Sequence, residues 1–184
     1  SLLMDDFFLR LRGRTVWLAG GRRIGQTVAE TLAELGVNLV LTYRGSQETA
    51  EQTARRCQAL GVKALVLPAD ISQKADAEKV VRQAAAEATP IDALVNLASV
   101  FTAAPLAAIT EHDWDETIAA HILGGFWPAQ VLAEDWRRRR HKGKIIFFTD
   151  RTTVEGGRPY LNHLPYIVTK GAAQTMVKVL AKEL

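Results

Sequence analysis

Residues 15–25 read TVWLAGGRRIG and join a short apolar run to a glycine-rich turn. The run at residues 15–19 predicts a buried β-strand, and residues 27–35 carry apolar side chains at helical spacing before Gly36. Strand, glycine turn and helix in this order form the context that a dinucleotide-binding fingerprint requires. There, glycines let the backbone approach a pyrophosphate, and the helix N-terminus offers it free N–H groups. An ordinary strand-to-helix turn is the alternative.

The same alternation continues along the chain. Further strands are expected at residues 38–43, 63–67, 91–95 and 144–149, and further helices at residues 47–60, 73–88, 113–139 and 166–184. Five strands alternating with helices predict the α/β class, with a doubly wound parallel sheet, right-handed crossovers and a helical layer on each face. The length of 184 residues suits one domain, which we expect to cover residues 1–184.

Polar or glycine residues follow each predicted strand. In a doubly wound sheet, ligands bind at the carboxyl ends of the strands. The residues that fall at these ends are Gly20, Arg44, Asp70, Asn96 and Asp150. Taken singly, each has a structural alternative; Asp70, for example, either meets an adenine or simply begins a turn. Their convergence on one edge of the sheet predicts a nucleotide site there.

The end of the second predicted strand bears on which nucleotide is bound. Tyr43, Arg44, Gly45 and Ser46 stand there, and no acidic residue occurs before Glu48. A carboxylate in this region would bind the ribose 2′-hydroxyl of NAD, whereas an arginine accommodates the 2′-phosphate of NADP. The local chemistry therefore favours NADP(H). The alternative is that Arg44 is merely exposed in a loop.

Tyr166 and Lys170 are four residues apart in the last predicted helix, so that their side chains lie one above the other. A phenol has an ordinary pKa of about 10, and a neighbouring ammonium is expected to lower it by stabilising the phenolate. A phenol tuned in this way donates a proton to a carbonyl oxygen or takes one from an alcohol. Alone, this spacing also occurs on solvated helix faces.

The composition limits the other classes of function. The chain is 48% apolar and 23% charged, and it has no apolar run of the ~20 residues that a membrane span needs. One cysteine, Cys57, excludes an internal disulfide and favours a reducing, cytoplasmic setting. The formal net charge is +3, and much of it lies in the basic run 137–142. We interpret this run as a solvated helix end rather than a nucleic-acid patch, because no aromatic residues interleave it.

With these motifs in place, residues 13–184 resemble the short-chain dehydrogenase/reductase family, whose domain has the Rossmann fold. The resemblance rests on the glycine turn, Asp70, the VNLAS sequence at residues 95–99, Trp114-Asp115, and Tyr166 with Lys170. The pteridine-reductase-like subgroup resembles the chain most, through Arg23-Ile24-Gly25, the N-x-A-S pattern at residues 96–99 and the aspartate that ends the fifth strand.

The resemblance implies a role for each matching residue. The cofactor would touch Gly20, Gly21, Arg22, Arg23, Ile24, Tyr43, Arg44, Gly45, Ser46, Asp70, Ile71, Asn96, Ala98, Ser99, Tyr166 and Lys170. Tyr166 would be the general acid, with Lys170 holding the nicotinamide ribose. Asp150 would orient substrate or cofactor, or donate a proton if burial raises its pKa. No metal is expected.

The chain also departs from the family. Ala19-Gly20 replaces the usual threonine-glycine, and His121 stands where the family has an asparagine whose backbone holds a water in a proton relay. His121 keeps that backbone role or adds a proton shuttle, or else it is only a packed histidine. The interval from Asp150 to Tyr166 is sixteen residues, three more than the family usually has, so that Thr152 or Thr153 becomes a candidate for the family's serine hydroxyl.

These expectations combine into one function. We expect an NADPH-dependent reductase of a carbonyl or imine, with a pterin-like, 3-oxoacyl or ketone substrate. A catalytically inactive NADP(H)-binding regulatory protein or subunit is the alternative. The family also implies a homo-oligomer, a dimer or tetramer, that packs through the helices at residues 113–139 and 166–184. Family members continue with two more strands, so we expect that a C-terminal part is missing here.

Overall fold

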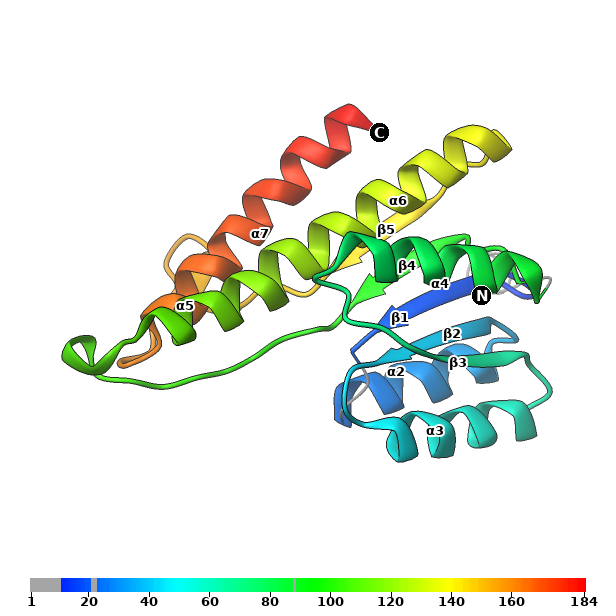
Figure 1. Cartoon of the computed structure of the whole chain (residues 1–184), viewed down its shortest axis with the longest axis horizontal. Coiled ribbons are helices and arrows are strands. Elements are labelled where there is room, and N and C mark those ends of the chain that lie inside the picture. Colours follow the sequence, from blue (N-terminus) through cyan, green and yellow to red (C-terminus); the bar gives the residue numbers. More distant parts are fainter. Residues whose placement is uncertain (1–10, 21–22, 88) are drawn as a thin grey trace.

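The computed structural model describes residues 11–20, 23–87 and 89–184. It contains a parallel five-stranded sheet in the order β3-β2-β1-β4-β5 (Figure 1). The strands are β1 (Thr15–Ala19), β2 (Asn38–Tyr43), β3 (Ala64–Pro68), β4 (Ala93–Asn96) and β5 (Lys144–Phe147). The doubly wound parallel sheet predicted from the sequence is confirmed.

Helices connect the strands and cover both faces of the sheet (Figure 1). They are α2 (Arg23–Glu34), α3 (Gln47–Ala59), α4 (Lys74–Ala86), α5 (Glu111–Ile118), α6 (Gly124–Arg139) and α7 (Leu164–Glu183), with the short helical turns η1 (Leu106–Ala108), η2 (Ala119–Leu123) and η3 (Arg151–Thr153). Within the described residues, no helix combines the length and the hydropathy that crossing a bilayer requires.

The core has two halves because successive side chains of a strand point to opposite faces. On β1, Val16 and Leu18 pack against α2 and α3, whereas Trp17 and Ala19 pack against α4 and α6. Trp17 has 0% exposure, and its indole N–H donates to Thr42 Oγ1 at 3.0 Å. Both faces of the central strand β1 are therefore buried, and this packing fixes the position of its carboxyl end at the edge of the sheet.

The helix after the glycine turn begins earlier than the sequence indicated, because α2 begins at Arg23 instead of residue 27. Gly20 has a φ of +92°, and a Cβ there would lie 2.6 Å from the backbone nitrogen of Ala98. A Cβ on Gly25 would collide with the carbonyl oxygen of Gly20. Glycine is therefore required at both ends of this turn, which packs against the segment that follows β4.

The long helical region expected at residues 113–139 is present, but it is not one regular α-helix. The π-helical segment η2 separates α5 from α6 and ends directly before Gly124. A capping box begins α5: Thr110 Oγ1 accepts from the Asp113 N–H, and Asp113 accepts from the Thr110 N–H. π-Helical turns often mark functional positions, and this one contains His121.

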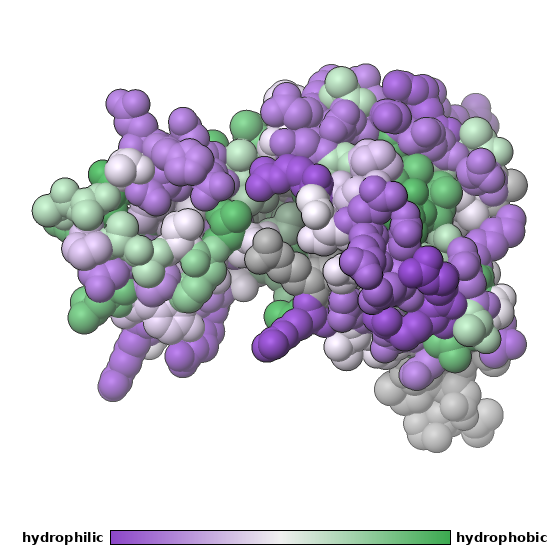
Figure 2. All heavy atoms as spheres, turned by 60° about the horizontal axis from the view of Figure 1, so that its bottom comes forward, coloured by the Kyte–Doolittle hydropathy of each residue, from purple (hydrophilic) through white to green (hydrophobic). Residues whose placement is uncertain are grey.

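The basic run ends α6, as we interpreted it from the sequence. Arg139 donates to Asp135 at 2.7 Å and to the carbonyl oxygen of Ile91 at 2.6 Å, so it fastens the end of α6 to the start of β4. Figure 2 shows mainly hydrophilic surface on the right and more hydrophobic and neutral surface on the left, the end where Figure 1 places α5 and the start of α7. Large exposed apolar side chains at this end of the molecule include Phe101, Leu106, Leu161 and Leu164.

Candidate active site

Strand register brings the predicted site residues to one edge. Ala19 pairs with Asn96 and with Thr42, and Asn96 pairs with Phe147, so the strands end side by side. The residues that follow these strands, from Gly20 to Asp150, therefore share that edge, as expected. Gly21 and Arg22 were also assigned to the cofactor site, but they lie outside the described residues.

The polar residues after β2 and β3 lie close together. Arg44 Nη1 lies 4.0 Å from Asp70 Oδ2, and the Arg44 side chain is 66% exposed. Asp70 Oδ1 also accepts hydrogen bonds from the backbone N–H and the hydroxyl of Ser72, at 3.0 and 2.7 Å. An exposed guanidinium at this corner leaves most of its donors free for a ligand, while Asp70 is engaged within the turn.

The side chains after β4 are engaged within the protein. Asn96 donates to the carbonyl oxygen of Gly124 at 2.8 Å and accepts from the backbone N–H of Ala98 at 3.0 Å. The first bond fastens the end of β4 to the start of α6, and the second holds the segment after β4. The polar atoms of the Asn96 side chain thus already have protein partners.

Tyr166 and Asp150 form the closest polar pair of the site. The Tyr166 hydroxyl donates to Asp150 Oδ2 at 2.7 Å, and the tyrosine is 7% exposed. Burial, followed by the hydrogen bond to Asp150 and its negative charge, raises the pKa of Tyr166 above its ordinary value. The expected fall in this pKa is therefore not found in this arrangement, because desolvation and a carboxylate both favour the neutral phenol.

Asp150 is held as a carboxylate. Its burial acts to raise its pKa, but hydrogen bonds from the Thr152 backbone N–H, at 2.9 Å, and from the Tyr166 hydroxyl outweigh burial and hold the pKa below its ordinary value. The hypothesis that burial makes Asp150 a proton donor is thus corrected. The sequence could not settle this, because the two donors that stabilise the charge come from a 3₁₀ turn and from a different helix.

Lys170 is buried beneath this pair, with 5% exposure. Its ammonium donates to the carbonyl oxygen of Phe148 at 2.9 Å and lies 5.9 Å from the centre of the Tyr166 ring. Burial lowers the pKa of Lys170, while the charge of Asp150 acts to raise it. An ammonium has three donors, and within the described residues Phe148 is its one hydrogen-bond acceptor. Two donors thus remain for ligand hydroxyls.

His121 belongs to the same region and is 3% exposed. Its ring meets the Tyr166 ring edge to face, with centroids 5.4 Å apart. Its Nε2 accepts from the Val100 N–H at 3.2 Å and lies 3.0 Å from Ser99 Oγ, whereas Nδ1 lies 2.7 Å from Thr169 Oγ1. Ser99, another predicted cofactor residue, therefore directs its hydroxyl toward His121.

Aromatic side chains that the sequence did not suggest surround Tyr166. Phe101 meets the Tyr166 ring edge to face at 4.8 Å and stacks on His163 at 4.2 Å, while 60% of Phe101 remains exposed. Tyr160 lies 6.0 Å from Phe101. The sequence did not indicate this group of rings, because they come from two loops far apart in the sequence, although Phe101 closely follows the N-x-A-S pattern.

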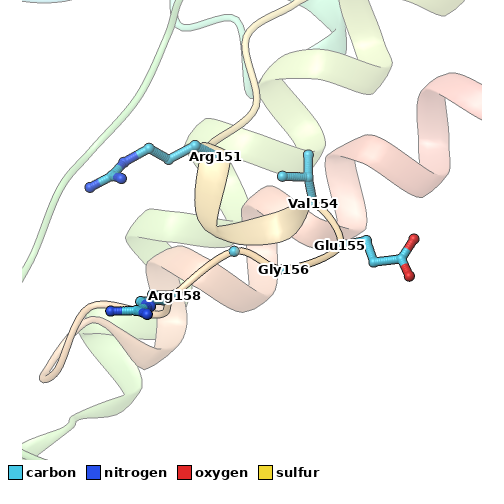
Figure 3. Close-up of a pocket in the computed structure, with 6 residues that line it drawn as sticks. Arg151, Val154, Glu155, Gly156 and Arg158 are labelled. Carbon is cyan, nitrogen blue, oxygen red and sulfur yellow. The ribbon is translucent and has the colours of Figure 1, made fainter.

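An open cavity lies in the loop after Asp150 (Figure 3). Its volume is about 360 Å³, and it is lined by Arg151, Val154, Glu155, Gly156, Gly157 and Arg158. In Figure 3 the side chains of Arg151 and Arg158 lie on one side of the loop, and the carboxylate of Glu155 lies on the other. Cationic groups therefore border this cavity on the side away from Glu155.

The two threonines considered as substitutes for the family's serine differ. Thr153 Oγ1 donates to the backbone carbonyl oxygen of Asp150 at 2.7 Å. Thr152 Oγ1 is buried and has no hydrogen-bond partner within the part of the chain that the structure describes. Neither hydroxyl forms a hydrogen bond with Tyr166, whose hydroxyl bonds to Asp150 in the part of the chain that the structure describes.

Comparison with known proteins matches a family described as short chain dehydrogenase to residues 14–184. A short chain dehydrogenase of Emericella nidulans, mdpC, is 30% identical over 95% of this chain and 64% of its own length. A 3-oxoacyl-[acyl-carrier-protein] reductase of Staphylococcus epidermidis is 28% identical over 89% of this chain and 65% of its own. A Serratia marcescens short-chain dehydrogenase/reductase structure superposes with a TM-score of 0.84 at 29% identity, over 95% of this chain and 69% of its own. The chain thus spans somewhat less than two thirds of these two sequence relatives.

Proposed function

This chain belongs to the short-chain dehydrogenase family, and from that premise we propose that it is an NADPH-dependent reductase of a carbonyl or imine group. The single observation that carries the proposal is the placement of Tyr166, Lys170 and Asp150 together at the carboxyl edge of the sheet. Family membership makes a nicotinamide cofactor the expected partner. The preference for NADPH and the identity of the substrate are part of the proposal.

Several features fit a dinucleotide. The turn at Gly20 and Gly25 brings backbone against backbone at the start of α2, where N–H groups are free for a pyrophosphate. Lys170 has two uncommitted donors for the ribose hydroxyls beside the nicotinamide. Arg44 is exposed, and its ion pair with Asp70 is long, at 4.0 Å, so its guanidinium suits a 2′-phosphate. When bound, the cofactor supplies a hydride.

The protein supplies the proton. The Tyr166 hydroxyl, held by Asp150 at 2.7 Å, turns to a substrate oxygen or nitrogen and gives up its proton there. A phenolate remains, and the ammonium of Lys170, 5.9 Å from the ring centre, stabilises that charge. Lys170 thus opposes the cost that burial and Asp150 impose on the phenolate.

Asp150 restricts the substrate. As a carboxylate it accepts hydrogen bonds and cannot donate one to a carbonyl oxygen. It therefore suits a substrate with an N–H group beside the reacting bond, such as a pterin. The relative named a 3-oxoacyl-[acyl-carrier-protein] reductase supports a 3-oxoacyl thioester instead. In either case the body of the substrate would lie on Phe101 and extend toward Arg151.

The test is NADPH oxidation by the complete protein, followed at steady state with biopterin, 3-oxobutanoyl-CoA and ethyl 3-oxobutanoate. Tyr166→Phe removes the proton donor and keeps the ring, so turnover of any accepted substrate should fall by about 10²- to 10⁴-fold. Lys170→Ala should lower turnover as well and weaken NADPH binding. Unchanged turnover in Tyr166→Phe would contradict the assigned acid.

The second candidate is a nucleotide-binding protein without catalysis. The raised pKa of Tyr166 and its bond to Asp150 favour this possibility, because both make the phenol a poorer acid. Tight NADPH binding by the complete protein, with no turnover of the three probes, would support it. Measurable turnover that disappears in Tyr166→Phe would exclude it.

We also propose that the complete protein is a homodimer or homotetramer that packs through α6 and α7. Val168 and Val179 on α7 are 48% and 54% exposed, which supports an apolar contact at this helix. Light scattering coupled to gel filtration would measure the mass. A mass equal to one chain at micromolar concentration would contradict this assembly.

A further inference from the structure

His121 joins three separate segments at the centre of the site. It lies in η2, which separates α5 from α6. One ring nitrogen faces Ser99 and Val100 in the segment after β4, and the other faces Thr169 in α7. The residue is almost fully buried, with 3% exposure. A buried imidazole with partners on both nitrogens is held in one orientation.

The partners determine which nitrogen carries the proton. The Val100 backbone N–H can only donate, so Nε2 must be the acceptor, and the proton of the neutral ring lies on Nδ1. Nδ1–H then donates to Thr169 Oγ1 at 2.7 Å, and Thr169 donates in turn to the carbonyl oxygen of Pro165, also at 2.7 Å. Every donor in this series of hydrogen bonds thus has an acceptor, and the series ends at the Pro165 carbonyl oxygen in the first turn of α7.

We propose that His121 is a positioning residue, a neutral imidazole that clamps the segment after β4 to the first turn of α7 and so fixes Tyr166 for proton transfer. The clamp reaches Tyr166 by two routes: Thr169 also lies 3.1 Å from the Tyr166 carbonyl oxygen, and the His121 ring meets the Tyr166 ring edge to face. This inference rests on the proposed function, because it assigns Tyr166 the role of acid.

The surroundings of the ring oppose a proton shuttle. Burial, followed by the charge of Lys170, lowers the pKa of His121 to about 3. A second proton would go to Nε2 and break the hydrogen bond from Val100. The titratable groups near the His121 ring come from α7. Lys170 acts on the ring through its positive charge, and Tyr166 contacts it edge to face. The ring therefore stays neutral where the enzyme works.

The first experiment reads the tautomer directly. Imidazole ¹⁵N shifts of the complete protein, labelled at histidine and assigned with His121→Gln, should show Nδ1–H at His121 and no titration between pH 5 and 8. An Nε2–H tautomer, or a titration in that range, would overturn the clamp. This readout needs no turnover, so it decides the clamp even if none of the probes is a substrate and the proposed function fails.

The second experiment separates the two ends of the clamp. The longer Gln side chain extends to the position of Nε2, so His121→Gln keeps an acceptor for the Val100 N–H and loses the bond to Thr169. The shorter Asn side chain extends to the position of Nδ1, so His121→Asn keeps a donor for Thr169 and loses the bond to Val100. Each should lower kcat by about 10- to 100-fold, because small displacements of a reacting group have effects of that size. The KM for NADPH should stay within about twofold, since Lys170 and Arg44 are untouched.

The pH dependence distinguishes positioning from proton transfer. A positioning residue lowers kcat by the same factor at every pH from 5 to 8, whereas loss of a shuttle removes an ionisation from the profile. An ionisation that is present in the wild type and absent from both His121 variants would overturn the proposal. His112→Gln is the matched control, because His112 is exposed on α5, and its kcat should not change.

A double-mutant cycle tests the Thr169 contact. Thr169→Val and His121→Gln delete the same hydrogen bond from its two sides. Their effects on kcat should therefore be far less than multiplicative, with the double variant close to the poorer single variant. Multiplicative effects would show that His121 and Thr169 act separately and would overturn the clamp.

Discussion

At the residue scale, Tyr166 and Asp150 hold one proton between them, and their surroundings keep this proton on the phenol. The tyrosine pKa is raised by burial and by the neighbouring carboxylate, and the aspartate pKa is lowered by two donors that outweigh its burial. The pair is thus stable as neutral phenol and carboxylate. The proposed reduction requires the protonated phenol, so this arrangement would keep the acid protonated at alkaline pH, and Lys170 would act once the proton has left.

Asp150→Asn should lower the pKa of Tyr166, because the substitution removes the negative charge that favours the neutral phenol. Reduction needs Tyr166 protonated, so the alkaline fall in kcat should move to lower pH in the variant. The tyrosinate absorbance during a pH titration, compared with Tyr166→Phe, would measure the shift. Glu155→Gln, which removes an exposed carboxylate of the next loop, is the control. An unchanged Tyr166 pKa in Asp150→Asn would contradict this account.

His121 should make stability depend on pH. Its pKa is about 3 in the folded protein and 6.5 when unperturbed, so between these values the unfolded chain binds more protons than the folded one. Stability contributed by neutral His121 is complete above pH 6.5 and is lost on acidification, by about 2 kcal/mol between pH 6.5 and pH 5. Urea unfolding at pH 5 and pH 7 would measure it. His121→Asn should show a smaller loss; an equal loss in wild type and variant would contradict the assignment.

At the scale of elements, the site depends on interruptions of regular structure. The π-helical segment η2 turns His121 inward, and the 3₁₀ turn η3 directs the Thr152 N–H to Asp150. The glycine turn before α2 packs backbone on backbone against the segment after β4. These three segments hold the groups around Tyr166, which itself lies in the regular first turn of α7.

Gly20→Ala should destabilise the protein by about 2 kcal/mol or more, because a side chain at positive φ is strained and its Cβ would meet the backbone of Ala98 at 2.6 Å. Chemical denaturation would measure the loss. Gly45→Ala is the matched control: no atom lies within 4 Å of its Cβ position, and its φ is not positive, so its stability should not fall. Equal stabilities for the two variants would contradict the packing described here.

The whole molecule gathers a cofactor edge from strands that are far apart in the sequence. Parallel pairing aligns the ends of β1, β2, β4 and β5. Arg44 lies at the end of β2, while Lys170 reaches the end of β5 by its bond to Phe148. A dinucleotide would span this edge, with its phosphate-bearing ribose toward Arg44 and its nicotinamide toward Tyr166.

Arg44→Ala should weaken NADPH binding by about tenfold or more, which corresponds to the loss of one charge-assisted contact to phosphate. NADH has no 2′-phosphate, so its Kd should stay the same. Fluorescence titration of the complete protein with both nucleotides would measure the ratio. Arg14→Ala, at the amino end of β1, is the control for a lost surface charge. Equal affinity for NADPH and NADH in the wild type would remove the role given to Arg44.

The sequence by itself determined the alternation of strands and helices, the parallel sheet and the edge at which the site residues gather, because hydrophobic periodicity and turn residues act locally. It also pointed to Tyr166 and Lys170 as a pair on one helix. Helix boundaries moved by a few residues, and the long helix before β5 proved to be interrupted at η2.

Only the tertiary structure decided where the protons lie. The shared proton of Tyr166 and Asp150 depends on burial and on donors from η3, and the orientation of His121 depends on Thr169, 48 residues away in the chain. The ordinary pKa of a side chain follows from its chemical type, whereas the shift depends on solvent exposure and on neighbours brought by folding. For that reason candidate residues for the site could be named from the sequence, but the charge that each one carries could not.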